Sequence, residues 1–173
     1  MYSIIEKLSN YLNSLIEIIV IALIAILTIL TFTGVIARYV TGTPLTWLYE
    51  ITVIAFAWTV FLGTSIAFKK REHIMIEFVG NALSKKSKRI LLMATAVLLI
   101  AFLAIVVKEG FHIVNQTLPQ KYQTIDLSTA WFYASFPVSA IISILHLIKE
   151  VIDLALNKVD LDAEKEINLS VMG

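Results

Sequence analysis

The chain has 173 residues, of which 58% are hydrophobic and only 16% are charged, and it contains no cysteine. This composition excludes an ordinary soluble domain of this size and indicates an integral membrane protein. The lack of cysteine excludes disulfides, thiolate zinc sites and iron–sulfur clusters. The net charge of +1 is uninformative as a total, and no nucleic-acid partner is expected.

Four apolar runs are each long enough to cross a bilayer core of about 30 Å as a helix. They predict spans at about residues 18–37, 51–68, 90–107 and 127–148. Helices are predicted rather than a β-barrel, because backbone groups in hydrocarbon must pair within their own segment and the runs lack strand alternation. The first run is too long for a signal peptide and has no small-residue cleavage site after it, so we expect it to remain. The predicted fold class is all-α, with four transmembrane helices in one membrane domain, residues 1–173.

Two segments beside these spans look amphipathic. Apolar residues recur at helical spacing over about 3–16 and again over about 73–84, with polar residues between them. Such segments tend to lie in the membrane interface; for the second, a short solvated turn is the alternative. The end of the chain, 158–173, mixes both signs of charge with few large apolar residues and is expected to be a poorly ordered tail.

The distribution of Lys and Arg predicts the orientation. The N-terminus, the second connection and the C-terminus carry eleven of these residues and the other side three, which puts both termini in the cytoplasm. Seven of the eleven lie in the second connection: Lys69, Lys70, Arg71, Lys85, Lys86, Lys88 and Arg89.

The middles of the predicted spans contain no ionisable residue. A transporter that works alone usually carries polar groups near the midplane, so we expect no catalytic, substrate-binding or metal site in this chain. The histidines, His73, His112 and His146, lie in connections or at a span end, where haem ligation is not expected.

Two stripes of small residues predict close helix packing, because small side chains let another helix approach. They consist of Ala55, Thr59, Gly63 and Ala67 in the second span, and Ser135, Ser139 and Ser143 in the fourth. The two stripes can pack on each other, or one of them can face another protein.

Glu50 raises the main question about function. Arg38 ends the first span and Glu50 opens the second, so the two charges should lie at similar depth and form a structural pair. Contact with a partner subunit and an ion or proton site remain the alternatives for Glu50. Trp47 and Tyr49 fit an aromatic belt at the membrane surface, and Trp58 is taken as a further interface anchor.

The order of "ARYVTGTPLTWLYE", "WTVFLGTSIAF" and "KKREHIMIEF" resembles the DctQ family, the small membrane subunit of tripartite ATP-independent periplasmic (TRAP) transporters. The resemblance covers roughly residues 30–145, and its specific part, 38–78, includes Arg38, Pro44, Trp47, Glu50, Trp58, Leu62, Gly63, Arg71, His73 and Ile74. Tyr49 stands where the family often has a first acidic residue, and Pro137 matches a proline of the fourth span more loosely.

The resemblance implies a non-catalytic scaffold in the bacterial inner membrane for a sodium-coupled importer of organic acids, with sialic acid and dicarboxylates as candidates. It implies two partners, a large membrane subunit that holds the sodium and substrate sites and a periplasmic substrate-binding protein. No cofactor is expected in this chain. Two alternatives remain: a self-sufficient four-helix transporter that couples cations or protons through Glu50, and a membrane anchor of another complex.

Overall fold

The computed structural model describes residues 2–70 and 85–156. In these residues the regular structure is helical: α1 (Tyr2–Thr41), α2 (Thr46–Lys70), α4 (Lys85–Thr117) and α5 (Ala130–Ala155). An isolated antiparallel bridge joins Lys121 and Ser128 in the connection between α4 and α5. The predicted all-α fold class is confirmed.

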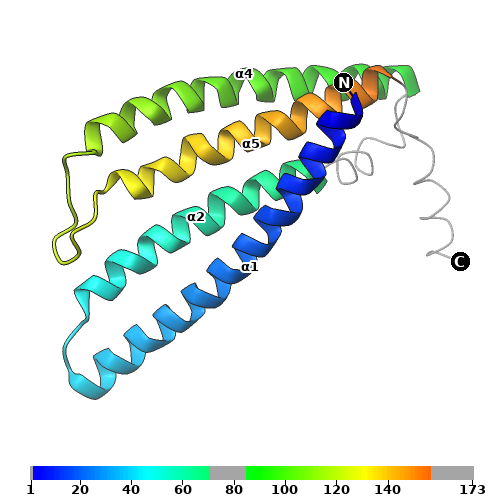
Figure 1. Cartoon of the computed structure of the whole chain (residues 1–173). Helices are drawn as coiled ribbons and strands as arrows, with labels where there is room; N and C mark the ends of the chain where they lie inside the picture. Colours follow the sequence, from blue (N-terminus) through cyan, green and yellow to red (C-terminus); the bar gives the residue numbers. More distant parts are fainter. Residues whose placement is uncertain (1, 71–84, 157–173) are drawn as a thin grey trace, which may run out of the picture.

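The described helices lie side by side in the order α4, α5, α2, α1 (Figure 1). α4 and α5 run antiparallel, as do α1 and α2, and α5 packs against α4 on one side and α2 on the other. The beginning of α1 also touches α5 near its C-terminal end. The α1–α2 link and the α4–α5 loop therefore lie at one end of the molecule, which we call the loop end.

α1 is one continuous helix of 40 residues, about 60 Å at a rise of 1.5 Å per residue. The predicted interfacial segment over 3–16 forms the first part of this helix, and residues 2–33 contain no glycine or proline that would interrupt it. Its place in the membrane interface stays a prediction. The helix ends only at Gly42, whose φ of 70° is a left-handed conformation that favours glycine. Pro44 follows, and α2 begins at Thr46.

The other helices also extend past the predicted spans. α4 continues beyond residue 107 to Thr117 and stops just before Pro119. The ring of a proline disfavours the helical conformation of the residue before it. α5 continues beyond residue 148 to Ala155. Charged residues such as Lys108 and Lys149 do not end a helix, although they end an apolar run. The predicted interfacial segment 73–84 and the tail 158–173 lie outside the described residues.

Two clusters of buried side chains hold together the helices α1, α2, α4 and α5, which we call the frame. Between α4 and α5 the cluster is formed by Ala96, Leu103, Ala140 and Leu147. Between α1 and α2 it is formed by Ile16, Val20 and Leu62, with Trp58 and Ile142 packed against it.

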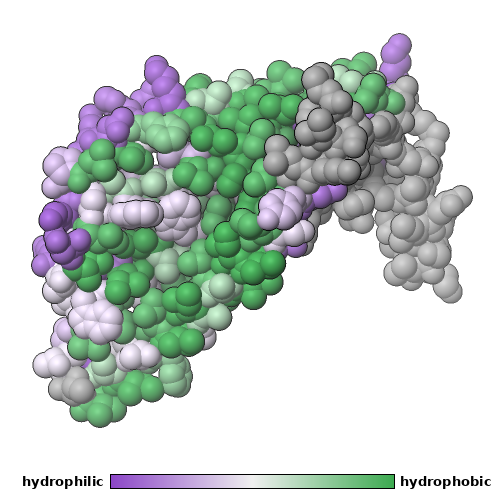
Figure 2. All heavy atoms as spheres, in the orientation of Figure 1, coloured by the Kyte–Doolittle hydropathy of each residue, from purple (hydrophilic) through white to green (hydrophobic). Residues whose placement is uncertain are grey.

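Large apolar side chains cover much of the outer surface of α1 and α4 (Figure 2). Within the described residues, three helices are long and apolar enough to cross a membrane, over Ser9–Val40, Thr46–Lys69 and Lys86–Thr117. Such a surface is suited to lipid or to a membrane partner rather than to water.

Candidate functional site

The Glu50 carboxylate binds the loop between α4 and α5. Its Oε1 accepts the N–H groups of Gln123 at 3.0 Å and Thr124 at 3.2 Å, and its Oε2 accepts those of Thr124 and Ile125, both at 3.1 Å. The Thr124 hydroxyl also donates to Oε2, at 2.6 Å. Glu50 is only 6% exposed. Successive backbone N–H groups that converge on one anion form a compact binding nest, which here is filled by a side chain of α2.

The loop has its own internal structure. Tyr122 N–H donates to Leu127 O at 3.0 Å, and Thr129 N–H donates to Gln120 O at 2.9 Å, which closes a narrow antiparallel turn. The Ser128 hydroxyl lies within hydrogen-bond distance of Leu118 O, at 2.9 Å. The Glu50 contact then ties the tip of this turn to α2, so the loop has a fixed position relative to the frame.

Two titratable groups of the loop respond to these contacts. Lys121 lowers the pKa of Asp126 below its ordinary value by a hydrogen bond and by its charge. Burial raises the pKa of Tyr122 above its ordinary value, and the nearby charge of Glu50 raises it further. At neutral pH the loop therefore carries an exposed ion pair and a neutral phenol.

Glu50 has a different set of partners from the one we predicted. Its carboxylate faces the 123–125 turn, and no ion pair to Arg38 is present in the part of the chain that the structure describes. The reason is the direction of the side chain. Leu48 and Thr52 face α1, and Glu50 is two positions from each, about 200° around the helix. Arg38 and Glu50 can therefore lie at a similar depth although Glu50 is on the side of α2 that faces away from α1.

Both carboxylate oxygens of Glu50 are occupied by N–H and O–H donors. This geometry favours the structural interpretation of Glu50, because a cation or proton site would need free oxygen lone pairs that face a membrane pathway. Within the described residues, no group of three or more His, Cys, Asp or Glu side chains is arranged to hold a metal ion.

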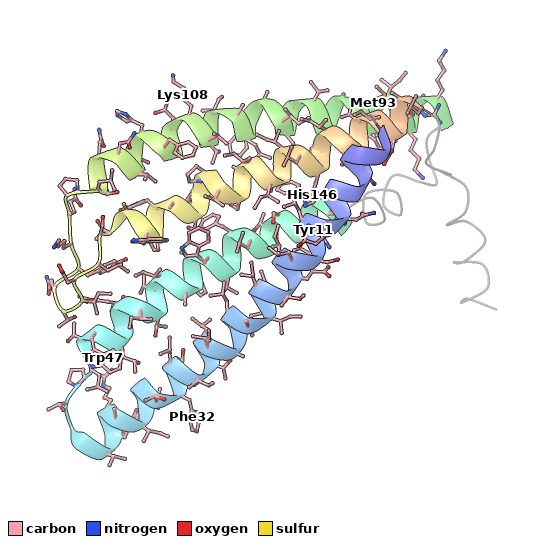
Figure 3. The ribbon with its side chains drawn as sticks, in the orientation of Figure 1. Tyr11, Phe32, Trp47, Met93, Lys108 and His146 are labelled. Atoms are coloured by element: carbon pink, nitrogen blue, oxygen red, sulfur yellow. The ribbon has the colours of Figure 1, made fainter. Side chains whose placement is uncertain are left out.

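The predicted interface aromatics have different surroundings. Trp47 and Tyr49 are exposed near the start of α2, and Trp47 lies next to the α1–α2 link (Figure 3). Trp58 instead packs between helices, and its Nε1–H donates to Trp131 O at 3.0 Å. It therefore ties α2 to α5, a role that its spacing in the sequence did not indicate.

The two small-residue stripes also differ. Ser135, Ser139 and Ser143 are buried, and each hydroxyl lies within hydrogen-bond distance of a carbonyl of α5 itself. In the α2 stripe only Ala55 is buried, and a Cβ added at Gly63 would meet no atom within 4 Å. Ala67 is exposed. Gly63 is thus not a close-packing position among the residues that the structure describes.

The closest glycine contact between α4 and α5 was not predicted. A Cβ added at Gly110 would lie 3.0 Å from Pro137 Cδ and 3.1 Å from its Cβ. The α-carbon of Gly110 therefore packs on a rigid proline ring inside α5. A lone glycine at the edge of an apolar run gave no signal of this contact.

A second polar cluster lies at the opposite end of the molecule. His146 on α5 faces the beginning of α1 (Figure 3), and its Nδ1 shares a hydrogen bond of 2.9 Å with Ser9 Oγ. Lys69 Nζ donates to Ser9 O at 3.4 Å. Three helices, α1, α2 and α5, meet at this point. The sequence placed His146 near a span end, but it did not reveal its partner.

The basic residues used to predict orientation are not all free surface charges. Lys86 is exposed, whereas Lys88 is only 7% exposed and Arg89 Nε is buried. Arg71 lies outside the described residues. Lys149, near the end of α5, pairs with Asp153 at 3.1 Å.

Taken together, the apolar helices and the structural use of Glu50 define a helical integral membrane protein. The family described as "Tripartite ATP-independent periplasmic transporters, DctQ component" matches residues 27–157. The chain belongs to this family, which comprises transporter components and not a known class of enzyme.

Three relatives agree with this assignment. The chain is 28% identical over 143 residues to the sialic acid TRAP transporter permease protein SiaT of Haemophilus influenzae, covering 80% of this chain but 23% of that protein. It is 21% identical to the sialic acid TRAP transporter small permease protein SiaQ of Vibrio cholerae, over 68% of each chain. The C4-dicarboxylate TRAP transporter small permease protein DctQ of Vibrio cholerae is 25% identical, over 58% of this chain and 43% of that protein. The chain thus spans less than a quarter of the first relative.

Proposed function

We propose that this chain is the non-catalytic scaffold subunit of a sodium-coupled TRAP importer of organic acids. In this proposal it holds the large permease subunit in the bacterial inner membrane, with both of its own termini in the cytoplasm and four spans, α5 being the fourth. Sodium and substrate bind to the large subunit. The family assignment and the apolar outer faces of α1 and α4 support this role.

The observation that carries the proposal is the engagement of Glu50. Glu50 borders the second predicted span, and its carboxylate is bound by the chain's own loop. The middles of the predicted spans contain no ionisable residue, and an importer subunit of this kind needs another subunit to bind sodium and an anionic substrate.

The ordered loop supports a further part of the proposal, in which it helps to dock the periplasmic binding protein. In the proposed orientation the loop faces the periplasm, and Lys121 and Asp126 are exposed on it. A loop that is already ordered loses little conformational entropy when a partner binds.

For the substrate, we propose a sialic acid, with C4-dicarboxylates as the second candidate. The relatives whose names specify sialic acid cover more of this chain than the relative whose name specifies a C4-dicarboxylate. Competition between the two acids for uptake by the reconstituted transporter decides this question.

The test is to co-express the chain with its large permease subunit, purify both in mild detergent and reconstitute them in liposomes. We expect one complex in size exclusion, with uptake that needs a sodium gradient and the periplasmic binding protein. Uptake by this chain alone that is lost in Glu50→Gln would contradict the scaffold role and favour the self-sufficient transporter. A complex formed with a different kind of partner would favour the membrane-anchor alternative.

A further inference from the structure

Arg38 is the charged residue that ends the apolar run of α1. Its side chain is exposed near the end of α1, and the described residues provide it with no ion pair. The acidic side chain at similar depth, Glu50, is engaged by the loop on another side of α2. At the edge of a membrane span a guanidinium reaches the headgroup level, where an anion from outside the chain can pair with it.

Arg38 lies beside a groove of about 390 Å³ between α1 and α2. Gly34 and Val35 of α1 and Leu48 of α2 line it, and Arg38, Tyr39 and Tyr49 surround its outer end. Because Gly34 has no side chain, Leu48 approaches α1 closely: its Cδ2 would lie 2.8 Å from an added Cβ. The groove is therefore mainly apolar along its length, with one cation at the outer end.

The depth of this site matches the level of lipid phosphates. Twenty uncharged residues, from Ile18 to Ala37, precede Arg38, and as helix they span about 30 Å, the thickness of the hydrocarbon core. Tyr39 and Tyr49 are 84% and 69% exposed, as expected for aromatic side chains at the headgroup level. The phosphate of a phospholipid is the abundant anion at this depth.

We propose that the α1–α2 groove binds one phospholipid, with its phosphate on the Arg38 guanidinium and one acyl chain along Gly34, Val35 and Leu48. Arg is well suited to this role because its planar fork can donate two parallel N–H bonds to phosphate. The proposal stands on the geometry of this chain alone and does not depend on the proposed transport function.

The experiment uses the full-length chain, purified in mild detergent, stripped of lipid and titrated with phosphatidylglycerol, with bound lipid counted by native mass spectrometry. Wild type is expected to bind one lipid molecule at least about tenfold more tightly than Arg38→Gln, since hydrogen bonds to charged groups are lost. Val35→Trp, which fills the groove and keeps the charge, should weaken binding similarly. Lys108→Gln is the matched control, because Lys108 is an exposed cation on α4 outside the groove.

Diacylglycerol, which has the same acyl chains and no phosphate, tests the role of the headgroup. Weaker binding of diacylglycerol to wild type supports the proposal, whereas equal binding overturns it. The proposal also fails if Arg38→Gln keeps wild-type affinity for phosphatidylglycerol. It fails equally if Arg38→Gln leaves lipid binding unchanged while it weakens assembly with the large subunit, since Arg38 would then serve a protein carboxylate.

Discussion

At Glu50 a single carboxylate receives three backbone N–H groups and one hydroxyl from a loop more than seventy residues away in the sequence. Glu50→Gln keeps the size of the side chain but replaces one acceptor oxygen with an NH₂ group that would face N–H donors. We expect amide hydrogen exchange over residues 121–127 to become at least about tenfold faster. Hydrogen exchange followed by mass spectrometry measures this directly.

The control for this variant is Lys121→Gln, which removes the exposed pair with Asp126 and keeps the Glu50 contact. Exposed ion pairs contribute little to stability, so exchange over 121–127 should change by less than about threefold. Unchanged exchange in Glu50→Gln would mean that the loop holds its shape without the carboxylate.

Ser9 and His146 join the beginning of α1 to α5 through buried polar atoms. Ser9→Ala leaves both ring nitrogens of His146 without a partner in the described residues, because Nε2 already has none. A buried polar group left unsatisfied costs about 1–3 kcal/mol, so we expect a lower thermal midpoint in detergent and faster exchange over residues 9–16. Ser14→Ala is the control, since Ser14 is exposed on the same helix. Equal midpoints in the two variants would show that the bond does not stabilise the fold.

Among the helices, the α4–α5 contact depends on a glycine that meets a rigid ring. Gly110→Leu places a side chain against Pro137, whose nearest atom would lie 3.0 Å from the added Cβ. Overpacking of this kind typically costs about 1–3 kcal/mol, and we expect the variant to unfold at lower temperature or to be purified in lower yield.

Gly63→Leu is the matched comparison on α2, where an added Cβ meets no atom within 4 Å. We expect this variant to be as stable as wild type when the chain is alone in detergent. If it nevertheless fails to assemble with the large subunit, that face of α2 is part of the interface. Equal loss of stability in both glycine variants would contradict the packing described for α4 and α5.

The sequence predicted the existence and order of the helices better than their ends or contacts. Apolar runs predict where hydrocarbon is crossed, but a charged residue at the end of a run does not end the helix. α1 ends beside Gly42, whose φ is left-handed, and α4 ends just before Pro119. The site was predicted in part. Glu50 could be recognised as important from its position beside a span, but its partner depends on the rotation of α2 and on a polar loop whose N–H groups carry no sequence signal.

For the whole molecule, the packing places the start of α4, the end of α5 and the start of α1 at the end of the frame opposite the loop end (Figure 1). If the loop end faces the periplasm, as the excess of Lys and Arg elsewhere predicts, α5 must cross the membrane as the fourth span. The chain contains no cysteine, so single cysteines can be introduced without background reactivity.

We therefore predict the labelling of Gln120→Cys, Lys86→Cys and Leu156→Cys by a membrane-impermeant maleimide. All three positions are exposed. In cells with an intact inner membrane and a permeable outer membrane, Gln120→Cys in the α4–α5 loop should react, whereas Lys86→Cys and Leu156→Cys should react only after the inner membrane is opened. Reaction of Leu156→Cys together with Gln120→Cys in intact cells would show that α5 does not cross. The reverse pattern, with only Lys86→Cys and Leu156→Cys accessible, would invert the orientation and leave the Glu50-bound loop in the cytoplasm, where it could not meet a periplasmic binding protein.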